Sequence, residues 1–401
     1  MALLPVDEAL ERVLDGLQPL PPEELPLADA AGRVLVGALK ARRTQPPFNA
    51  SAMDGYAVRS ADIASPPASL AVTGESAAGR RFPGAVGPGE AVRIFTGAPV
   101  PDGADTILIQ ENAVPVDEGR IEALQAVAPG RHIRRAGLDF RGGDVVLQEG
   151  RLLDPAALSL AAAAGHARLP VVRRPVIAVI ATGDELVPPD ETPGPDQIVA
   201  SNNFGIGALA RMDGADVLDL GIVPDDREAI AGAIRRALGA RADIIVTLGG
   251  ASVGEHDLVR EVLTSEGMDL AFWKIAMRPG KPLMFGRFGG ARVLGLPGNP
   301  VSSLVCAHLF LRPLMARLSG RVFRPDLRPA FLGKPMKAND ERQDYVRAVV
   351  VEGFEGLLAT PFDLQDSSML TALAAANALI IREPNAPAAE PGSPCRVLML
   401  R

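Results

Sequence analysis

The chain has 401 residues, of which 47% are hydrophobic and 22% charged, and its formal net charge is −7. At about 100–200 residues per domain, this length predicts two to four domains. Nucleic-acid binding needs a basic face that displaces phosphate counterions, so the acidic balance argues against that class. Two cysteines are too few for a disulfide framework. The sequence contains no run of about 20 apolar residues, so it predicts no membrane span. We therefore expect a soluble, cytoplasmic protein that binds neither nucleic acid nor membrane.

The first 173 residues combine helical and strand patterns. Residues 5–18 and 28–36 carry apolar residues at helical spacing, and residues 155–165 are alanine-rich and helical. Residues 48–147 contain short β-branched runs separated by glycine and proline, which is typical of a β-rich module. We expect a discontinuous helical and mixed domain, residues 1–45 and 138–173, and a β-rich inserted domain, residues 46–137.

Residues 174–320 follow another pattern, in which helical stretches separate short apolar runs at 175–181, 216–223, 243–248 and 292–296. This alternation indicates a parallel sheet covered by helices on both faces. A long helix is expected over residues 304–318. Further short strands are expected at 345–351, 357–360, 378–382 and 396–400. The expected fold is therefore multi-domain α/β plus β, with a doubly wound parallel-sheet domain over residues 174–323 and a C-terminal β barrel over residues 324–401.

Four loops at the expected carboxyl ends of these strands carry glycines, hydroxyls and carboxylates; they are residues 181–185, 224–226, 248–257 and 296–303. Ligands of open parallel sheets bind at this edge, where helix N-termini favour anions. Small residues let backbone N–H groups approach an oxyanion such as phosphate. Carboxylates in the same loops would repel that anion unless a divalent cation lies between them. The loops therefore predict a phosphorylated ligand bridged to the protein by Mg²⁺.

Each of these features also has a purely structural interpretation. Asp225 or Asp226 is a good helix N-cap, and the loops can be ordinary turns. The turn that contains Arg278 and Lys281 precedes a strand expected at residues 283–285, and it is either a solvated turn or a phosphate clamp. His256 could act as a general base, but a lone histidine beside acids is more often structural, and Cys306 is expected to be a core residue. No Gly-x-Gly-x-x-Gly motif follows the first strand and no phosphate-loop motif is present, which argues against a dinucleotide or nucleoside-triphosphate fold.

Taken in order, the motifs resemble a known family. They are Ser51-Ala52-Met53-Asp54-Gly55-Tyr56-Ala57, Thr96-Gly97-Ala98-Pro99, Thr182-Gly183-Asp184-Glu185, Ser252-Val253-Gly254 with Asp257, Pro279-Gly280-Lys281-Pro282 and Leu296-Pro297-Gly298-Asn299-Pro300. Together they resemble the molybdopterin molybdenumtransferase family, which includes bacterial MoeA and the C-terminal domain of gephyrin. The resemblance implies an elongated four-domain homodimer. It also implies a reaction in which molybdate is inserted into adenylylated molybdopterin with Mg²⁺-dependent release of AMP, and other molybdenum cofactor biosynthesis proteins as further partners.

The resemblance also implies roles for individual residues. The polar set expected to act on the metal, molybdate and adenylylated pterin comprises Asp54, Thr96, Asp184, Glu185, Asp225 and Asp257. The expected metal ligands are Glu185, Asp225 and Asp257. The residues expected to bind the pterin ligand are Ser51, Gly249, Gly250, Ser252, Gly254, Arg278, Lys281, Pro297, Gly298, Asn299 and Ser302. Ser51 and Asp54 are expected to line the same cleft from the partner subunit. The chain departs from the family at Arg278, where lysine is common, and at Ala251, where valine is common.

Two other functions remain open at this level. One is a related adenylyltransferase that prepares molybdopterin with Mg-ATP, which shares the α/β domain but is much shorter. The other is a non-catalytic scaffold of the gephyrin type. The Met53-Asp54-Gly55-Tyr56 module and the C-terminal β domain favour the molybdenum-inserting enzyme over the first, and the retained carboxylates argue against the second.

Overall fold

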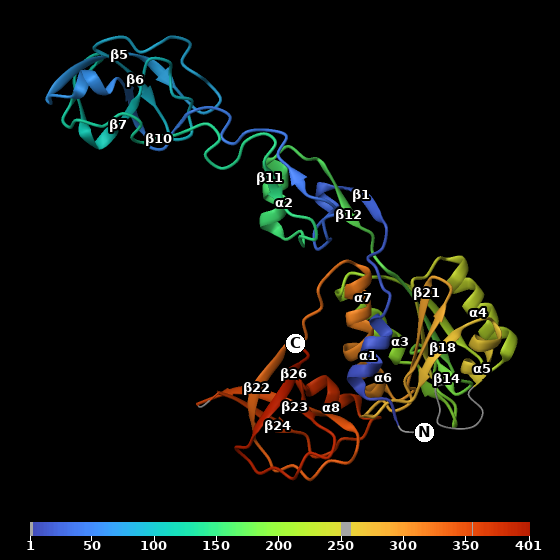
Figure 1. Ribbon diagram of the computed structural model, residues 1–401. Coiled ribbons are helices and arrows are strands. Elements are labelled where there is room, and N and C mark those ends of the chain that lie inside the picture. Colours follow the sequence, from blue (N-terminus) through green and yellow to red (C-terminus); the bar gives the residue numbers. More distant parts are fainter. Residues whose placement is uncertain (1–2, 250–257, 355) are drawn as a thin grey trace. The chain divides into compact units, whose positions relative to one another are not determined.

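The computed structural model describes residues 3–249, 258–354 and 356–401. The chain forms two compact units, of which the smaller comprises Glu24–Val171 and the larger comprises Met1–Glu23 with Val172–Arg401. The polypeptide therefore leaves the larger unit near Glu23 and re-enters it at Val172, as the colours of Figure 1 show.

The smaller unit contains a six-stranded sheet of order β7-β4-β6-β5-β9-β8. Its strands are β4 (Gly55–Val58), β5 (Ala68–Ser76), β6 (Glu90–Ile94), β7 (Thr106–Ile109), β8 (Ala113–Asp117) and β9 (Arg120–Ala123), with the 3-10 turns η2 (Ser60–Ile63) and η3 (Gln110–Asn112). Successive residues of a strand enter different cores, Ala57 and Ile107 on one face and Val58 and Leu108 on the other. This confirms the β-rich module expected from the glycine and proline spacing.

The remainder of the smaller unit consists of two-stranded ribbons and one helix, α2 (Pro155–Ala163). The ribbons pair β1 (Pro22–Pro26) with β12 (Arg168–Val172), β2 (Leu39–Lys40) with β11 (Val145–Leu147), and β3 (Ala50–Ser51) with β10 (Ile133–Arg134). Asp154 caps α2 by accepting a hydrogen bond from the Ala157 N–H at 2.8 Å.

The helix expected over residues 28–36 is wrong. Only the 3-10 turn η1 (Leu27–Asp29) forms there. Gly32 then adopts φ +71°, a left-handed conformation that does not continue a right-handed helix. Val34 and Leu35 form β-bridges with Leu152 and Val171, so their apolar side chains are buried through sheet pairing instead.

A six-stranded sheet of order β16-β13-β17-β21-β20-β18 forms the centre of the larger unit. Its strands are β13 (Val176–Thr182), β16 (Asp216–Val223), β17 (Ile244–Leu248), β18 (Asp269–Trp273), β20 (Met284–Phe288) and β21 (Ala291–Leu296). The four predicted strands are neighbours and run parallel, as expected. The sheet is nevertheless mixed, because β20 runs antiparallel to both β21 and β18. Only Gly289 and Gly290 separate β20 from β21, and such a short connection permits only an antiparallel hairpin.

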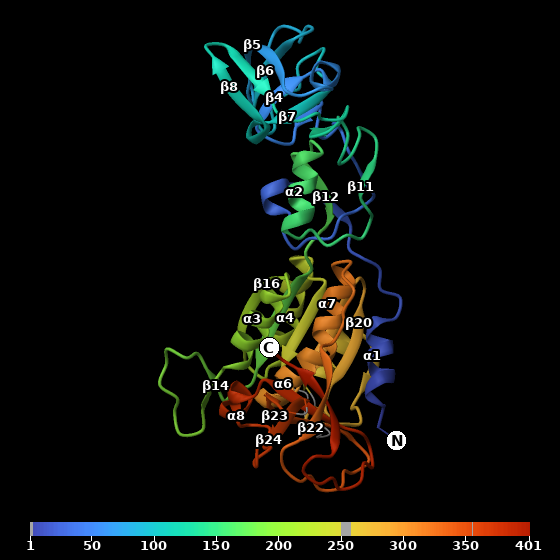
Figure 2. The ribbon, with the colours of Figure 1, turned by 90° about the vertical axis from the view of Figure 1, so that its left-hand side faces the viewer.

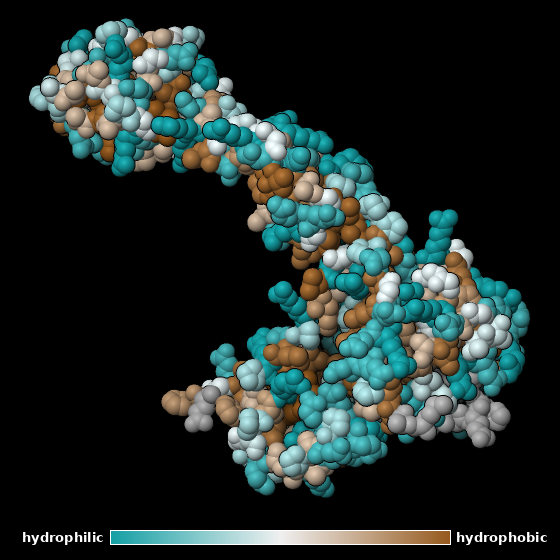
Figure 3. All heavy atoms as spheres, viewed as in Figure 1, coloured by the Kyte–Doolittle hydropathy of each residue, from teal (hydrophilic) through white to brown (hydrophobic). Residues whose placement is uncertain are grey.

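Helices cover both faces of this sheet (Figures 1 and 2). On one face lie α1 (Val6–Leu14), α3 (Asn202–Met212), α6 (Pro300–Cys306), the π turn η4 (Ala307–Leu311) and α7 (Arg312–Leu318), and on the other lie α4 (Arg227–Gly239) and α5 (Leu258–Ser265). Successive side chains of β13 point to opposite faces of the sheet. Ile177 belongs to the core on the face covered by α1, and Ala178 to the core on the face covered by α4. The outer surface over α4 and α5 is largely hydrophilic (Figure 3), as expected for amphipathic covering helices.

The helix predicted over residues 304–318 begins four residues earlier, at Pro300, and passes through the π turn to Leu318. It is the one helix in the described ranges that is long and apolar enough to cross a membrane, and 72% of its apolar stretch is buried inside the protein. Here it packs as a core helix, with Phe310 and Leu314 fully buried.

A closed five-stranded barrel follows. It contains β22 (Leu327–Leu332), β23 (Gln343–Gly353), β24 (Gly356–Pro361), β25 (Ala378–Arg382) and β26 (Pro394–Met399), and β25 pairs back onto β23 to close it. The helix α8 (Leu370–Ala375) and the short strand β19 (Met277–Arg278) attach to β23. Strand β22 was not expected because it contains Pro329; it pairs with β24 only at Phe331 and Leu332, so Pro329 has a strand partner on one side only.

Candidate functional site

A cavity of about 780 Å³ lies at the carboxyl ends of the parallel strands of the larger unit. Its walls come from the loops after β13, β16, β17 and β21, from β14 (Leu186–Val187) and β15 (Ile198–Val199), and from the start of α3. Ser368 and Leu370, the first residue of α8, complete them. Figure 2 shows the loop between β14 and β15 projecting from this end of the unit. The predicted residues that line the cavity are Glu185, Asp225, Gly249, Pro297, Gly298 and Asn299.

Three of the predicted carboxylates gather here. The Asp225 N–H donates to Asp184 Oδ1 at 3.0 Å, which joins the loop after β16 to the loop after β13. Burial, followed by the negative charges of Asp184 and Glu185, raises the pKa of Asp225. The adjacent Asp226 has the other role considered for this pair, since it caps α4 by accepting from the Ala229 N–H at 2.9 Å. Asp225 is thereby left available to the cavity.

The chemistry of this cluster fits Mg²⁺. It offers only oxygen donors, and burial together with the charges of Asp184 and Glu185 disfavours the ionised form of Asp225, which a bound cation would stabilise. Within the described part of the chain, no three His, Cys, Asp or Glu side chains are close enough to hold a metal unaided. Mg²⁺ commonly takes one or two carboxylates and completes its shell with water and substrate phosphates, which is the arrangement that Glu185 and Asp225 would permit.

Several predicted residues lie outside the described residues. They are Gly250, Ser252, Gly254 and Asp257, together with Ala251 and His256. Gly249, the first residue of that loop, is described. Its φ is +92°, and a Cβ added there would lie 2.6 Å from the carbonyl oxygen of Thr182. Glycine is therefore required at this position by both conformation and space.

The loop that begins helix Pro300–Leu318 is held by two asparagines. Asn202 donates from Nδ2 to the carbonyl oxygen of Gly298 at 2.7 Å, and Asn299 donates from Nδ2 to Ser367 Oγ at 2.9 Å. Pro297 is buried, Gly298 is exposed, and Ser302 is buried in the first turn. The N-terminal end of this long helix consequently faces the cavity, in the position where helix ends favour anions.

The two cations of the 278–282 turn have different surroundings. Pro282 lines the cavity, and the adjacent Lys281 is half-buried and forms no ion pair within the described part of the chain. Arg278, in contrast, is directed to Asp340, Asn339 and Asp344 of the barrel.

A second cluster lies in the smaller unit and contains Ser51, Asp54 and Thr96. Asp54 Oδ1 accepts two hydrogen bonds from Thr96, one from the backbone N–H at 2.7 Å and one from the hydroxyl at 2.8 Å. These bonds, the backbone one first, lower the pKa of Asp54. The buried Ser51 hydroxyl donates to the Met53 carbonyl oxygen at 2.5 Å, which closes the turn that carries Asp54.

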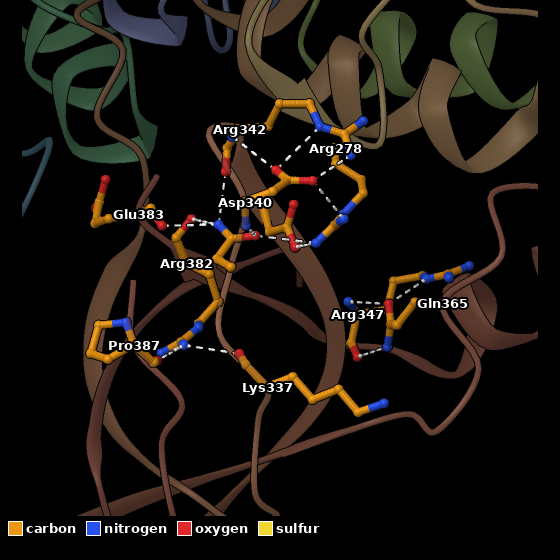
Figure 4. A network of polar contacts seen from close by, with 11 residues as sticks. Arg278, Lys337, Asp340, Arg342, Arg347, Gln365, Arg382, Glu383 and Pro387 are labelled. Carbon is orange, nitrogen blue, oxygen red and sulfur yellow. Dashed lines mark hydrogen bonds and ion pairs between the residues drawn. The ribbon is translucent and has the colours of Figure 1, made fainter. Parts of the chain in front are cut away.

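Sequence reasoning missed several residues at the cavity. Asn202 and Asn203 line it from the start of α3, and the polar run Ser201-Asn202-Asn203 before an apolar helix was an available signal. Arg347 gave no signal, because it is one residue of a barrel strand. It is only 2% exposed, and its guanidinium group donates to Gln365 Oε1 at 3.2 Å (Figure 4). The same group also donates to the Asp366 carbonyl oxygen at 2.8 Å. Arg347 thus fixes the segment that brings Ser368 to the cavity.

Comparison with known proteins gives matches along the whole chain. Residues 4–165 match the MoeA N-terminal region (domain I and II), residues 178–317 match a probable molybdopterin binding domain, and residues 329–400 match the MoeA C-terminal region (domain IV). A molybdopterin molybdenumtransferase from Haemophilus influenzae is 36% identical over 385 residues, which cover 95% of each chain. One from Bacillus subtilis is 34% identical over 406 residues, covering 99% of this chain and 94% of that one.

The crystal structure of a molybdopterin biosynthesis MoeA protein from Pyrococcus horikoshii covers 100% of both chains, with a TM-score of 0.86 and 30% sequence identity. Sequence relatives, domain matches and fold thus agree. The chain belongs to the MoeA family, whose curated members are named molybdopterin molybdenumtransferases.

Proposed function

We propose that the protein inserts molybdate into the dithiolene of adenylylated molybdopterin, with Mg²⁺-dependent release of AMP. The observation that carries this proposal is the cavity of the larger unit. It places the mutually repelling carboxylates Asp184, Glu185 and Asp225 beside backbone suited to an oxyanion at Gly249 and at the start of helix Pro300–Leu318. A phosphorylated ligand together with a divalent cation would satisfy both sets of groups.

In this proposal Glu185 and Asp225 hold Mg²⁺, and Asp184 orients Asp225 through the hydrogen bond to its N–H. When bound, Mg²⁺ supplies positive charge that neutralises the phosphoric anhydride as it is cleaved. Lys281 adds a fixed cation beside the cavity, because the prolines on both sides limit the freedom of its backbone. Cleavage of an anhydride depends mainly on charge neutralisation and positioning, which matches this set of residues.

We further propose that the protein acts as a homodimer and that Ser51, Asp54 and Thr96 of one subunit serve the cavity of the other. The support is chemical: Thr96 fixes the Asp54 carboxylate and lowers its pKa, so the smaller unit presents an organised carboxylate that has no ion-pair partner within the described ranges. An ionised carboxylate of this kind suits a second contact to a metal or substrate.

The experiment for the proposed function supplies adenylylated molybdopterin, molybdate and Mg²⁺ to the purified protein and quantifies AMP. Release that requires all three supports the proposal. Pyrophosphate release from molybdopterin and Mg-ATP would instead indicate an adenylyltransferase, and ligand binding with no turnover would indicate a scaffold.

A further inference from the structure

Arg278 lies immediately before the Pro279-Gly280-Lys281-Pro282 turn, and its side chain contacts residues of the C-terminal barrel. Its guanidinium group donates to Asp340 Oδ2 at 3.2 Å and to Asn339 Oδ1 at 3.1 Å, and it forms an ion pair with Asp344. The main chain makes the same connection, because β19 runs parallel to β23 with Arg278 opposite Asp344. Arg278 is therefore attached to the barrel through both its backbone and its side chain.

The charges around Arg278 are already balanced (Figure 4). Asp340 also accepts from Arg342 Nη2 at 2.6 Å. This bond, followed by a hydrogen bond from the Arg342 N–H and the charges of Arg342 and Arg278, lowers the pKa of Asp340 to about 2. Asp344 is buried, with its guanidinium partner on one side. Two carboxylates thus face two guanidinium groups, so the charge of Arg278 is already engaged by the barrel, with 47% of its side chain exposed.

The turn that follows is tightly constrained. Gly280 has φ +114°, and a Cβ there would lie 2.6 Å from Cys306 Sγ on α6. The Ile275 N–H donates to the Lys281 carbonyl oxygen at 2.9 Å. The turn is consequently held on one side by the packing of Gly280 against α6 and on the other by the attachment of Arg278 to the barrel.

We propose that Arg278 is a positioning residue, whose bonds to Asp344 and Asp340 fix this turn so that Lys281 is presented to the oxyanion of the substrate. The barrel is then a structural part of the substrate site, and Arg278 itself does not contact the substrate. The inference rests on the proposed function for the identity of the oxyanion, which is molybdate or the phosphate groups of adenylylated molybdopterin.

The kinetic test uses the full-length variants Lys281→Ala, Arg278→Gln and Asp344→Asn. Lys281→Ala identifies which of the two substrates has a KM that depends on this lysine. The other two variants should raise the same KM on the order of 10- to 100-fold, since small misplacements of a binding group have effects of this size. The double variant Arg278→Gln/Lys281→Ala should be no worse than Lys281→Ala alone, because Arg278 acts through Lys281.

Direct contact between Arg278 and the substrate makes the opposite predictions. The effects of Arg278→Gln and Lys281→Ala would then add, and Asp344→Asn would leave KM unchanged or lower it, because it frees the guanidinium group. Either result overturns the proposal. As a matched control, Arg328→Gln removes an exposed ion pair to Asp326 (2.7 Å) at the start of β22 and should leave every KM unchanged.

Amide hydrogen exchange provides a readout that does not depend on activity. In Arg278→Gln and Asp344→Asn, the amides of residues 274–283 should exchange about 10-fold faster or more, which is the loss expected for one charged hydrogen bond. Unchanged exchange there would overturn the positioning role even if the wild-type protein releases AMP. Conversely, a wild-type protein that releases no AMP would contradict the proposed function. The exchange experiment would then still test whether Arg278 attaches the turn to the barrel.

Discussion

Thr96 donates two hydrogen bonds to the same oxygen of Asp54, from its backbone N–H at 2.7 Å and from its hydroxyl at 2.8 Å. The pair joins the turn after β3 to the turn after β6, and it lowers the pKa of Asp54. Asp54 is therefore ionised throughout the neutral range.

Removal of the Thr96 hydroxyl should raise the pKa of Asp54. Because the pKa in the folded protein is depressed, Asp54 contributes stability that is present above the unfolded value of about 3.9 and is lost as pH falls through the folded value. Thr96→Val should therefore show a smaller loss of stability between neutral and strongly acidic pH than the wild type. NMR titration of the Asp54 carboxyl carbon and urea unfolding measure the two effects. Thr73→Val, on an exposed strand position, should change neither.

The pH dependence of stability expected from Asp225 has the opposite sign to that expected from Asp54. Its pKa is raised in the folded protein, so its ionisation opposes folding above that pKa, and the wild type should gain stability as pH falls through it. Asp225→Asn should therefore melt at or above the wild-type temperature at pH 7 without metal. Addition of Mg²⁺ should raise the melting temperature of the wild type and have a smaller effect on the variant, because ligand binding stabilises the state that binds it.

The neighbouring residue is the matched control for Asp225. Asp226→Asn removes the same charge one residue away, and asparagine caps a helix as well as aspartate does. It should keep both the wild-type melting temperature and the wild-type response to Mg²⁺. Equal behaviour of the Asp225 and Asp226 variants would refute a metal-binding role that is specific to Asp225.

Gly249→Ala should disturb the cavity. The added Cβ would meet the Thr182 carbonyl oxygen in a backbone conformation with φ +92°, and strain of this kind costs on the order of 1–3 kcal/mol. Thermal melting should show the loss of stability, and AMP release should fall with it. Gly239→Ala, at the end of α4 where nothing lies within 4 Å, should be neutral or stabilising. A Gly249→Ala protein with wild-type stability would show that the close approach to Thr182 is not required.

Mixed dimers test the proposed sharing of sites between subunits. Asp54→Asn and Asp225→Asn subunits are each expected to be inactive alone. If the cluster of one subunit serves the cavity of the other, a mixed dimer has one site with both defects and one intact site, so a random mixture should regain about one quarter of the wild-type activity. No recovery in a mixture shown to contain mixed dimers would place each site within a single subunit.

Some parts of the fold could be predicted from the sequence and others could not. The four parallel strands were predictable, because their apolar runs are continuous and helical patterns separate them. The proximity of Asp184 to Asp225 was predictable as well, since both follow strands whose carboxyl ends share an edge. A strand at residues 283–285 was predictable directly after the Pro-Gly-Lys-Pro turn, and β20 lies there. Its antiparallel direction was not predicted, because it is decided by the Gly289-Gly290 connection.

Long-range partners account for most of what sequence reasoning did not give. The local sequence of residues 278–282 does not predict that Arg278 contacts Asp340 and Asp344, because these residues lie 62 and 66 positions further along the chain. Arg347 reads as one residue of an alternating strand, yet it is buried and fixes the segment that carries Ser368. Such residues obtain their roles from tertiary contacts, and local periodicity does not record these contacts.

The central claim is that Asp225 acts with Mg²⁺ in a cavity that cleaves adenylylated molybdopterin. It is tested most directly by the rate of AMP release from adenylylated molybdopterin and molybdate across a Mg²⁺ titration, measured for the wild type, Asp225→Asn and Asp226→Asn. We predict Mg²⁺-dependent release by the wild type and Asp226→Asn, and a rate for Asp225→Asn that is lower on the order of 100-fold, as for other lost transition-state charge stabilisation. Release by Asp225→Asn at the wild-type rate at every Mg²⁺ concentration would contradict the claim.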